Sequence, residues 1–579
     1  MKTVLRQLGR YKKDALFCIG LTTLEVIMEI LLPFITAMII DQGLEAANLA
    51  AVYRYGIVMV ALAFLSLAFG ALAGKFAASA SSGFAANLRE AQYNRIQTFS
   101  FSNIDKYSVP SLVTRMTTDI TNVQNAFMMV IRMAVRSPLT LIFSYIMCFI
   151  ISPKLSLTFL LALLFLVLVI GGIMVITMKI FNEVFRKYDD LNASVQENVS
   201  AIRVVKAFVR EDYENQKFSS ASANLYRLFV KAEGMLALNN PAMMVAIYFC
   251  IIMISWLGAH YIVGGTMSSG ELTSLFSYVM SLLMSLMMLS MVIVMISMSM
   301  ASVRRISQVL REEPDLKEPE NPVYQVENGG IDFEHVTFSY KHGSGKNALT
   351  DIDLHIRPGE TIGVIGGTGS GKSSLVNLIC RLYDVDQGVV RVGGLDVRDY
   401  DMETLRNQVS VVLQKNTLFS GTILENLRWG NPQATEAECI AACQAACADE
   451  FIDRLPDGYQ TRIERGGANV SGGQKQRLCI ARALLKKPKV LILDDSTSAV
   501  DTATDAKIRA AFARTIPGTT KIIIAQRISS VEHADRILVL EEGHVNGFDT
   551  HENLLKTNAI YREIYESQIK GGGDFDQPA

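Results

Sequence analysis

The number of long apolar segments in the N-terminal half constrains this chain more than any other feature. A helix needs about 20 mostly apolar residues to cross the hydrocarbon core of a bilayer. Six stretches meet this requirement, and the third and fourth are separated only by a Ser-Pro-Lys turn. The sequence therefore predicts six membrane-spanning helices, at about residues 15–40, 55–80, 137–153, 154–178, 241–264 and 272–298.

Composition agrees with a protein that lies partly in lipid. Half of the 579 residues are hydrophobic and 19% are charged, which excludes a disordered chain. The net charge of −1 leaves no basic footprint for nucleic acid, so we expect no nucleic-acid partner. We expect a membrane domain (1–310), an acidic, Pro-rich linker (311–328), a soluble domain (329–570) and a disordered tail (571–579).

The distribution of basic residues predicts how the spans are oriented. The long connections at about 81–136 and 179–240 are rich in Lys and Arg, whereas the opposite connections carry only Arg54 and Lys154. Basic loops stay on the cytoplasmic side. We therefore expect a multi-pass protein of the cytoplasmic membrane whose N-terminus and soluble domain are cytoplasmic.

Two features of the predicted spans bear on the substrate that the protein binds in the membrane. Glu25 and Glu29 lie one helical turn apart within the first span, where an ionisable group is costly. A role in binding a cationic substrate or a proton competes with a simple interhelical hydrogen bond. The last span is rich in methionine, which either lines a path for varied apolar ligands or packs against lipid or against other helices. The methionines considered are Met284, Met287, Met288, Met291 and Met295.

The soluble half carries a phosphate-binding loop. The segment GGTGSGKSS follows the strand-like run TIGVI and precedes a helical pattern, as the GxxxxGK[ST] motif requires. Its backbone N–H groups would wrap the β- and γ-phosphates of ATP, Lys372 would add a positive charge, and Ser373 would hold Mg²⁺. The expected nucleotide-binding residues are Gly366, Thr368, Gly369, Ser370, Gly371, Lys372, Ser373 and Ser374.

Two further segments complete a nucleotide site. Asp494 ends an apolar strand-like run and is expected to be the second residue, beside Ser373, that holds the metal. The segment VSGGQ at 470–474 predicts a helix N-terminus that offers a second phosphate cradle. One P-loop and one separate, unfilled cradle suggest that two such domains share nucleotides face to face.

Together these motifs resemble the nucleotide-binding domain of an ABC transporter. The segments GGTGSGKS, VSGGQ and LILDDSTSAVD, with Gln414, occur in the order of that family, and the whole chain resembles one half of a type IV ABC exporter. The resemblance implies an all-α transmembrane domain of six helices. A P-loop α/β nucleotide-binding domain follows, with an antiparallel β subdomain and an α-helical signature subdomain.

The resemblance also implies roles for single residues. Tyr340 is expected to stack on adenine, and Gln414 to sense Mg²⁺ and couple it to the membrane helices. Asp501 is expected in a loop that reports across the dimer. The segments PSLVTRMTTDI and SAIRVVKAFVRE are similar to the coupling segments of the family. The signature expected to close over ATP on the opposing domain is formed by Ser471, Gly472, Gly473 and Gln474.

Two positions depart from the hydrolytic pattern of the family. Asp495 stands where the general base is usually Glu, and Gln526 stands where a His usually contacts the γ-phosphate. A shorter carboxylate leaves the attacking water about 1 Å out of reach, and a glutamine carries no charge and relays no proton. With Gln414, these residues form the expected catalytic set of a site that binds ATP and hydrolyses it poorly.

An intact signature beside a poor hydrolytic set suggests a non-identical partner that supplies the competent site. This resembles the degenerate-site half of bacterial heterodimeric multidrug exporters, which implies ATP-driven export of amphipathic small molecules, either drugs or lipids. A lipid or peptide transporter, a homodimer with two slow sites and an ATP-gated channel or regulator remain as alternatives.

Overall fold

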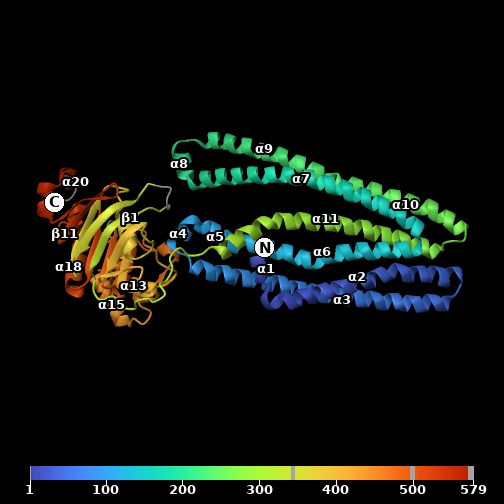
Figure 1. The fold of residues 1–579 in the computed structure, drawn as a ribbon, viewed down its shortest axis with the longest axis horizontal. Coiled ribbons are helices and arrows are strands. Elements are labelled where there is room, and N and C mark those ends of the chain that lie inside the picture. Colours follow the sequence, from blue (N-terminus) through green and yellow to red (C-terminus); the bar gives the residue numbers. More distant parts are fainter. Residues whose placement is uncertain (1, 341–345, 496–501, 572–579) are drawn as a thin grey trace. The chain divides into compact units, whose positions relative to one another are not determined.

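The computed structural model describes residues 2–340, 346–495 and 502–571. It divides into two compact units, which Figure 1 draws as a helical part and a part rich in strands. The first unit comprises Met1–Gln97 and Val109–Glu312. The second comprises Thr98–Ser108 and Glu313–Ala579, so a short segment from the N-terminal half belongs with the soluble domain.

Among the residues that the structure describes, six helical segments of the first unit are long and apolar enough to cross a membrane, as predicted. Each exceeds what a bilayer requires: the second has 49 residues, or about 70 Å of helix, against a hydrocarbon thickness of ~30 Å. The helices therefore continue well beyond the membrane. The segments are Gly9–Glu45, Leu49–Gln97, Val109–Ile151, Pro153–Ser200, Glu211–Val263 and Ser269–Arg311.

Local capping explains where several of these helices begin. The Ser152 side chain accepts a hydrogen bond from the backbone N–H of Leu155, and Pro153 occupies the first turn of α7. Ser268 and Glu271 form a capping box at the start of α11. The elements of this unit are α1 (Lys2–Arg6), η1 (Gly9–Tyr11), α2 (Lys12–Ile39), η2 (Ile40–Glu45), α3 (Leu49–Gln97), α5 (Val109–Met116), α6 (Thr118–Ile151), α7 (Pro153–Ser200), α8 (Ile202–Ala207), α9 (Glu211–Ala237), α10 (Asn239–Val263) and α11 (Ser269–Arg311).

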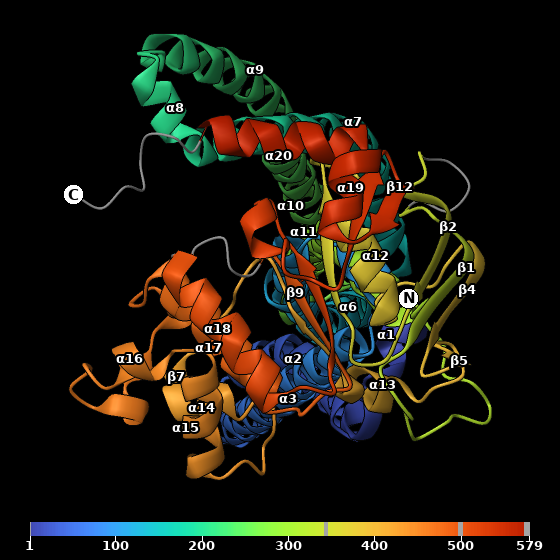
Figure 2. The same ribbon diagram turned by 90° about the vertical axis from the view of Figure 1, so that its left-hand side faces the viewer.

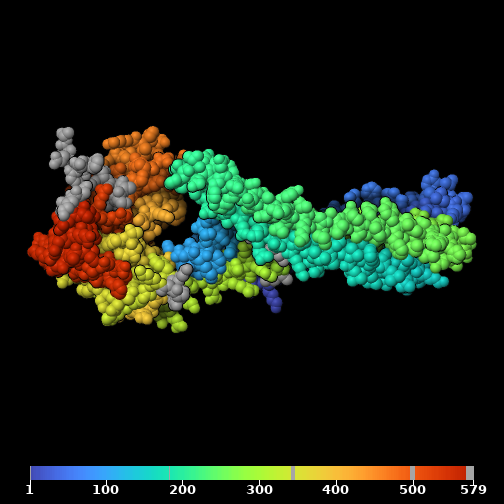
Figure 3. Space-filling view, turned by 90° about the horizontal axis from the view of Figure 1, so that it is seen from above, coloured from blue at the N-terminus to red at the C-terminus, as the bar shows by residue number. Residues whose placement is uncertain are grey.

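Helix pairs define the packing of this unit. The helices α2 and α3 pack together, α6 packs along α11, and α7 packs against α9 and α10. Figure 3 shows the last group as adjacent cyan and green helices. Buried polar contacts tie the pairs to one another: the Tyr278 hydroxyl donates to the Ile30 carbonyl at 2.8 Å, and Arg305 forms an ion pair with buried Asp119. Asp119, from the predicted coupling segment, thus lies inside the helical unit.

The second unit is built around a six-stranded sheet in the order β12-β11-β3-β10-β9-β6, parallel except for the β11–β12 hairpin. The central strands β9 and β10 are buried along their whole length, as expected for a sheet covered on both faces. A four-stranded antiparallel sheet has the order β2-β1-β4-β5, and β7 pairs with β8. The strands are β1 (Ile331–Phe338), β2 (Leu349–Ile356), β3 (Thr361–Gly366), β4 (Gln387–Val392), β5 (Leu395–Asp396), β6 (Val409–Val412), β7 (Gly421–Thr422), β8 (Arg462–Ile463), β9 (Val490–Asp494), β10 (Thr520–Ile524), β11 (Arg536–Glu541) and β12 (His544–Asp549).

Helices complete the second unit and confirm the predicted fold class. In Figure 2, α14 to α17 gather on one side and the antiparallel strands β1, β2 and β4 on the other. These are the helical and antiparallel subdomains. The helices are α4 (Phe101–Lys106), α12 (Lys372–Ile379), α13 (Met402–Gln408), α14 (Ile423–Leu427), α15 (Glu436–Ala445), α16 (Asp449–Ile452), α17 (Gly472–Leu484), α18 (Thr502–Thr515), α19 (His551–Thr557) and α20 (Ala559–Gly571), with short turns η3 (Gly458–Gln460), η4 (Arg465–Gly467) and η5 (Ile528–Ser530).

The helix α4 joins this unit through side-chain contacts that the sequence did not predict. The Tyr383 hydroxyl donates to the Asp105 carboxylate at 2.6 Å, and the Asn103 amide donates to the Glu313 carbonyl at 3.1 Å. This contact is made by α4, whereas the segment PSLVTRMTTDI, which begins at Pro110, lies in α5 and α6 of the first unit.

The close approach of Gly430 to α17 provides a test of how the signature helix is held. A Cβ atom at Gly430 would lie 2.0 Å from the backbone oxygen of Arg482, which cannot move without shifting α17. We expect Gly430→Ala to lower the free energy of unfolding by about 1–3 kcal/mol because overpacking strains the backbone. The measurement is thermal unfolding of the purified chain. Gly518→Ala is the control, since a Cβ there meets no atom within 4 Å; equal midpoints for the two variants would contradict the expectation.

Candidate nucleotide site

The P-loop connects β3 to α12, as the motif predicts. Gly371 is the residue before α12 and has a left-handed φ of 99°. A Cβ atom there would lie 2.7 Å from the Ala348 carbonyl oxygen. Only glycine satisfies both conditions. The loop therefore delivers its backbone N–H groups to the start of a helix, where an anion is stabilised.

Lys372 lies across this loop. Its ammonium group donates to the carbonyl oxygens of Gly366 and Gly367, both at 2.8 Å. Burial lowers the pKa of Lys372, while the nearby carboxylates of Asp494 and Asp495 act in the opposite direction. The ammonium is thus held at the mouth of the loop, where the phosphates of a nucleotide would replace the carbonyl oxygens as its partners.

Asp494 ends β9 and is buried, with 6% of its surface exposed. Burial raises the pKa of its carboxyl, and the hydrogen bond with Ser373 lowers it. A hydroxyl beside a buried carboxylate, next to a phosphate loop, is the oxygen-donor set that Mg²⁺ prefers. The residues therefore fit Mg²⁺, with Ser373 and Asp494 as its ligands. Bound there, Mg²⁺ would neutralise charge on the phosphates.

The two residues that depart from the family pattern contact each other. The amide of Gln526 donates to the Asp495 carboxylate at 2.8 Å. Asp495 adopts a left-handed backbone with φ 46°, which is uncommon for a residue other than glycine. Gln476 also approaches its carbonyl oxygen at 3.5 Å. The carboxylate in the general-base position is therefore already engaged by the residue in the γ-phosphate position.

The expected adenine platform lies beside the P-loop helix. Tyr340 is 47% exposed, so its ring is free to receive a base, and its hydroxyl pairs with the Ser374 hydroxyl at 3.0 Å. The ring packs edge-on against Tyr383, with centroids 5.1 Å apart. Tyr383 was missed in the sequence analysis, because nothing in a lone Tyr after the P-loop helix indicates that it supports this platform.

The signature forms the start of α17. Ser471 caps the helix and exchanges hydrogen bonds with Gln474, and both Ser471 and Gly472 are exposed. Gly473 follows in the first turn. Gln414 is exposed in the segment after β6, and its role toward Mg²⁺ stays a prediction. Asp501 lies outside the described residues.

Comparison with known proteins identifies the family. A family model for the ABC transporter transmembrane region matches residues 15–287, and one for the ABC transporter domain matches residues 349–498. Over 98% of its length the chain is 36% identical to YfiB of Bacillus subtilis (strain 168), an uncharacterized ABC transporter ATP-binding protein of which 99% is covered. The chain belongs to the ABC transporter family.

Other relatives support the same architecture. The uncharacterized ABC transporter ATP-binding protein Rv1273c of Mycobacterium tuberculosis (strain H37Rv) is 35% identical over 98% of both chains. A fatty acid ABC transporter ATP-binding/permease protein of M. tuberculosis (strain CDC 1551) is 32% identical over 82% of this chain and 75% of its own length. A solved bacterial Atm1-family ABC exporter with ATP bound covers 99% of both chains with a TM-score of 0.82 at 24% identity, which shows the same fold. With one transmembrane region and one ATP-binding domain, the chain is a half-transporter of this family and an ATPase coupled to transport. Half-transporters of this architecture work as dimers in a bilayer.

The membrane glutamates of this half-transporter are paired. Arg136 on α6 contacts Glu25 at 2.5 Å through one terminal nitrogen and Glu29 at 2.7 Å through the other. The interhelical contact is therefore an ion-pair triad rather than a simple hydrogen bond, and a role of the two glutamates toward a cation or a proton stays a prediction. Arg136 was missed because it precedes the third predicted span (137–153) by one residue, although its charge at that edge was a usable signal.

The methionines of α11 are largely exposed within this chain. Met284 is 54% exposed and Met291 60%, and Met287 and Met288 also lie in the exposed class, whereas Met295 is half-buried. Packing inside the chain therefore does not account for the stripe, and a role toward cargo stays a prediction.

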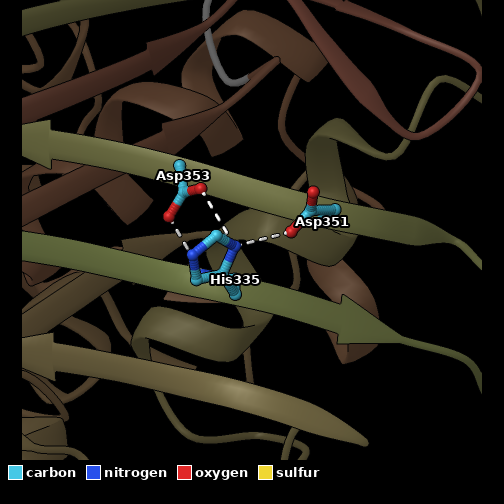
Figure 4. Close-up of side chains that lie close together, drawn as sticks. All are labelled: His335, Asp351 and Asp353. Atoms are coloured by element: carbon cyan, nitrogen blue, oxygen red, sulfur yellow. Dashed lines mark hydrogen bonds and ion pairs between the residues drawn. The ribbon is translucent and has the colours of Figure 1, made fainter.

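Figure 4 shows a charged cluster on the antiparallel sheet that the sequence analysis did not identify. His335 on β1 contacts Asp351 at 2.8 Å and Asp353 at 3.2 Å through Nδ1. All three side chains are exposed. The hydrogen bond with Asp351 is the largest cause that raises the pKa of His335, followed by the charges of Asp353 and Asp351. The cluster stabilises the protonated imidazole.

This cluster predicts a titration. We expect His335 to titrate above its ordinary value of 6.5 and Asp351→Asn to lower that pKa, because the substitution removes a carboxylate partner. Since the folded-state pKa is raised, the interaction is fully present below the unfolded pKa and is lost as pH rises through the folded pKa. The measurement is the pH dependence of the imidazole resonance by NMR. Asp332→Asn, which removes the carboxylate paired with His355, is the control and should leave His335 unchanged.

Proposed function

We propose that this half-transporter is one subunit of a heterodimeric exporter that moves amphipathic small molecules, drugs or lipids, outward across the cytoplasmic membrane. Its own P-loop would mainly bind ATP, and its signature would complete the competent site on the partner's P-loop. The termini and the soluble domain (329–570) would be cytoplasmic, and the membrane domain (1–310) would carry the cargo path. The paired departures at Asp495 and Gln526 carry this proposal.

The contact between Asp495 and Gln526 supports weak hydrolysis in two ways. A general base must reach the water it deprotonates, and the Asp495 carboxylate is both one methylene short and occupied by the Gln526 amide. The amide is neutral, so it cannot supply the charge or the proton relay of an imidazole. By contrast, Lys372, Ser373 and Asp494 keep the arrangement that binding requires.

The signature supports a second, competent site. Its capped helix end at Ser471 and Gly472 is exposed and intact, and it would face a nucleotide on a second domain rather than this chain's own P-loop. ATP binding would close the two domains and turn the cargo path outward, and hydrolysis at the competent site would reset them. An intact signature beside a weak hydrolytic set is what we expect if the opposing P-loop belongs to a different chain that supports turnover.

The membrane half supports an amphipathic cargo. Exposed methionines on α11 provide a polarizable surface that adapts to varied apolar shapes. The relative named as a fatty acid transporter favours a lipid-like cargo over a peptide.

The test of this proposal is ATP turnover by the chain alone and by the chain co-purified with a partner subunit. We expect the chain alone to hydrolyse on the order of 10²-fold more slowly than the complex while still occluding ATP, because a displaced general base costs about that factor. In the complex, Asp495→Asn should change turnover little, whereas Glu→Gln at the partner's equivalent position should abolish it.

Asp495→Glu is the matched variant, because it restores the methylene and keeps the charge. Faster turnover at this chain's own site would agree with the proposal. Brisk hydrolysis by the unmodified chain alone would instead indicate a homodimer that uses an aspartate base, and occlusion without transport of any amphiphile into vesicles would indicate a regulator.

A further inference from the structure

Arg132 is an unpaired guanidinium beside the membrane glutamates. It lies on α6, one turn before Arg136, and forms no hydrogen bond or ion pair within residues 2–340, 346–495 and 502–571. Its Nε is buried without a partner. A buried, unsatisfied donor is expensive, and more so when it is charged, so this group calls for an acceptor that the chain does not supply.

The two carboxylates that contact Arg136 are not available to Arg132. Arg136 places one terminal nitrogen on Glu25 and the other on both carboxylate oxygens of Glu29. The triad therefore has a net charge of −1, and Arg132 balances it without contacting it. The two glutamates and the two arginines together are neutral, but one cationic group and one carboxylate oxygen among them have no partner.

Unpaired acceptors lie on the facing helix α2. The second carboxylate oxygen of Glu25 is buried without a partner, in a residue only 6% exposed, and the buried Thr22 hydroxyl also lacks one. Cys18, on the same helix, interacts electrostatically with both Arg132 and Glu25 and contacts Thr22. The unpaired cation and the unpaired acceptors therefore lie on two helices, α6 and α2, that pack against each other.

Two glycines on α3 let its backbone come close to both charged groups. A Cβ at Gly70 would lie 2.8 Å from Glu25 Oε1, and a Cβ at Gly74 would lie 3.7 Å from Arg132 Nη1. The two glycines are one helical turn apart, so they present a single backbone groove to the charged cluster. Larger side chains at these two positions would displace the Glu25 carboxylate and the Arg132 guanidinium.

We propose that Arg132, Glu25 and Thr22 form a binding site for a zwitterionic head group. The anionic group of this head group, a phosphate or a carboxylate, would accept hydrogen bonds from Arg132. Its ammonium group would donate hydrogen bonds to the unpaired oxygen of Glu25 and to the Thr22 hydroxyl. A purely anionic or cationic head would fill one unpaired group and leave the other, and would add net charge to a neutral cluster in a low-dielectric region. This inference rests on the proposed export of amphiphiles and specifies their head-group chemistry.

The apolar part of such a molecule would lie toward α11. The helix α11, which carries the exposed methionines, packs along α6. A ligand anchored at Arg132 could therefore place its chain against that helix.

The test is equilibrium binding to the purified chain in nanodiscs, which does not depend on ATP hydrolysis. The probes share one acyl chain length: lysophosphatidylethanolamine, a monoalkyl phosphate, an alkylamine and a free zwitterionic N-alkyl amino acid. We expect both zwitterions to bind about tenfold or more tightly than either singly charged probe, a difference of about 1.4 kcal/mol. The reason is that each singly charged probe leaves one of the two unpaired groups without a partner. Binding of lysophosphatidylethanolamine but not of the N-alkyl amino acid would restrict the source to phospholipids and still support the site.

Substitutions separate the two charges. Arg132→Gln should remove the preference for the zwitterion over the alkylamine, and Glu25→Gln should remove its preference over the alkyl phosphate. Arg304→Gln, which removes an exposed arginine of α11, is the charge-matched control and should change neither. Gly74→Leu tests the site without altering a charge, so the inference stays testable if Arg132→Gln fails to fold. Arg132→Lys should bind the zwitterionic probes with intermediate affinity.

Two results would overturn the inference. One is equal affinity of all four probes for the unmodified chain, and the other is an unchanged zwitterion preference in both Arg132→Gln and Gly74→Leu. Neither result bears on the heterodimer, which the turnover measurements test separately. Loss of ATP-driven transport with intact zwitterion binding would reject the proposed export and keep the site.

Discussion

The hydrocarbon core of a bilayer offers no water to a peptide group, and this constraint governs the first unit. Every backbone polar group must be satisfied within its own helix, which leaves long apolar helices as the solution. The same constraint acts on side chains, because a charge at that depth must find a partner. Glu25 and Glu29 would be untenable alone and are stabilised by Arg136. The ion pairs of Arg136 hold α2 against α6. The need to pair these charges therefore determines a helix–helix contact that the pattern of apolar residues alone does not specify.

Sequence reasoning succeeded where a residue pattern reports its environment directly. The length of an apolar run reflects bilayer thickness, and the glycines of the P-loop reflect a backbone that approaches phosphate, so six spans and the nucleotide loop were predictable. It failed where a contact depends on packing between distant segments. Arg136, Tyr383 and the inclusion of α4 in the second unit depend on how elements meet, and a lone Arg or Tyr carries no sign of its partner.

The contact between Asp495 and Gln526 was predictable only in part from the sequence. The two residues are 31 positions apart, yet β9 and β10 are adjacent parallel strands in which Asp494 is paired with Ile524. Residues just beyond these strand ends must emerge at the same edge of the sheet. Each departure from the family pattern was visible in the sequence, but their mutual hydrogen bond followed only from strand register. The register explains why the two positions act as a unit rather than as independent substitutions.

This coupling bears on the proposed division of labour between subunits. A P-loop and a signature on one chain serve different nucleotides, so hydrolytic residues can be lost at one site without damage to the other. In a homodimer both sites would carry the engaged aspartate, and no reset step of ordinary speed would remain. In a heterodimer only one site would, and it would become a long-lived ATP clamp that holds the domains together while the other site turns over. The intact phosphate loop, the engaged carboxylate and the intact signature are therefore the observations on which we propose the second arrangement.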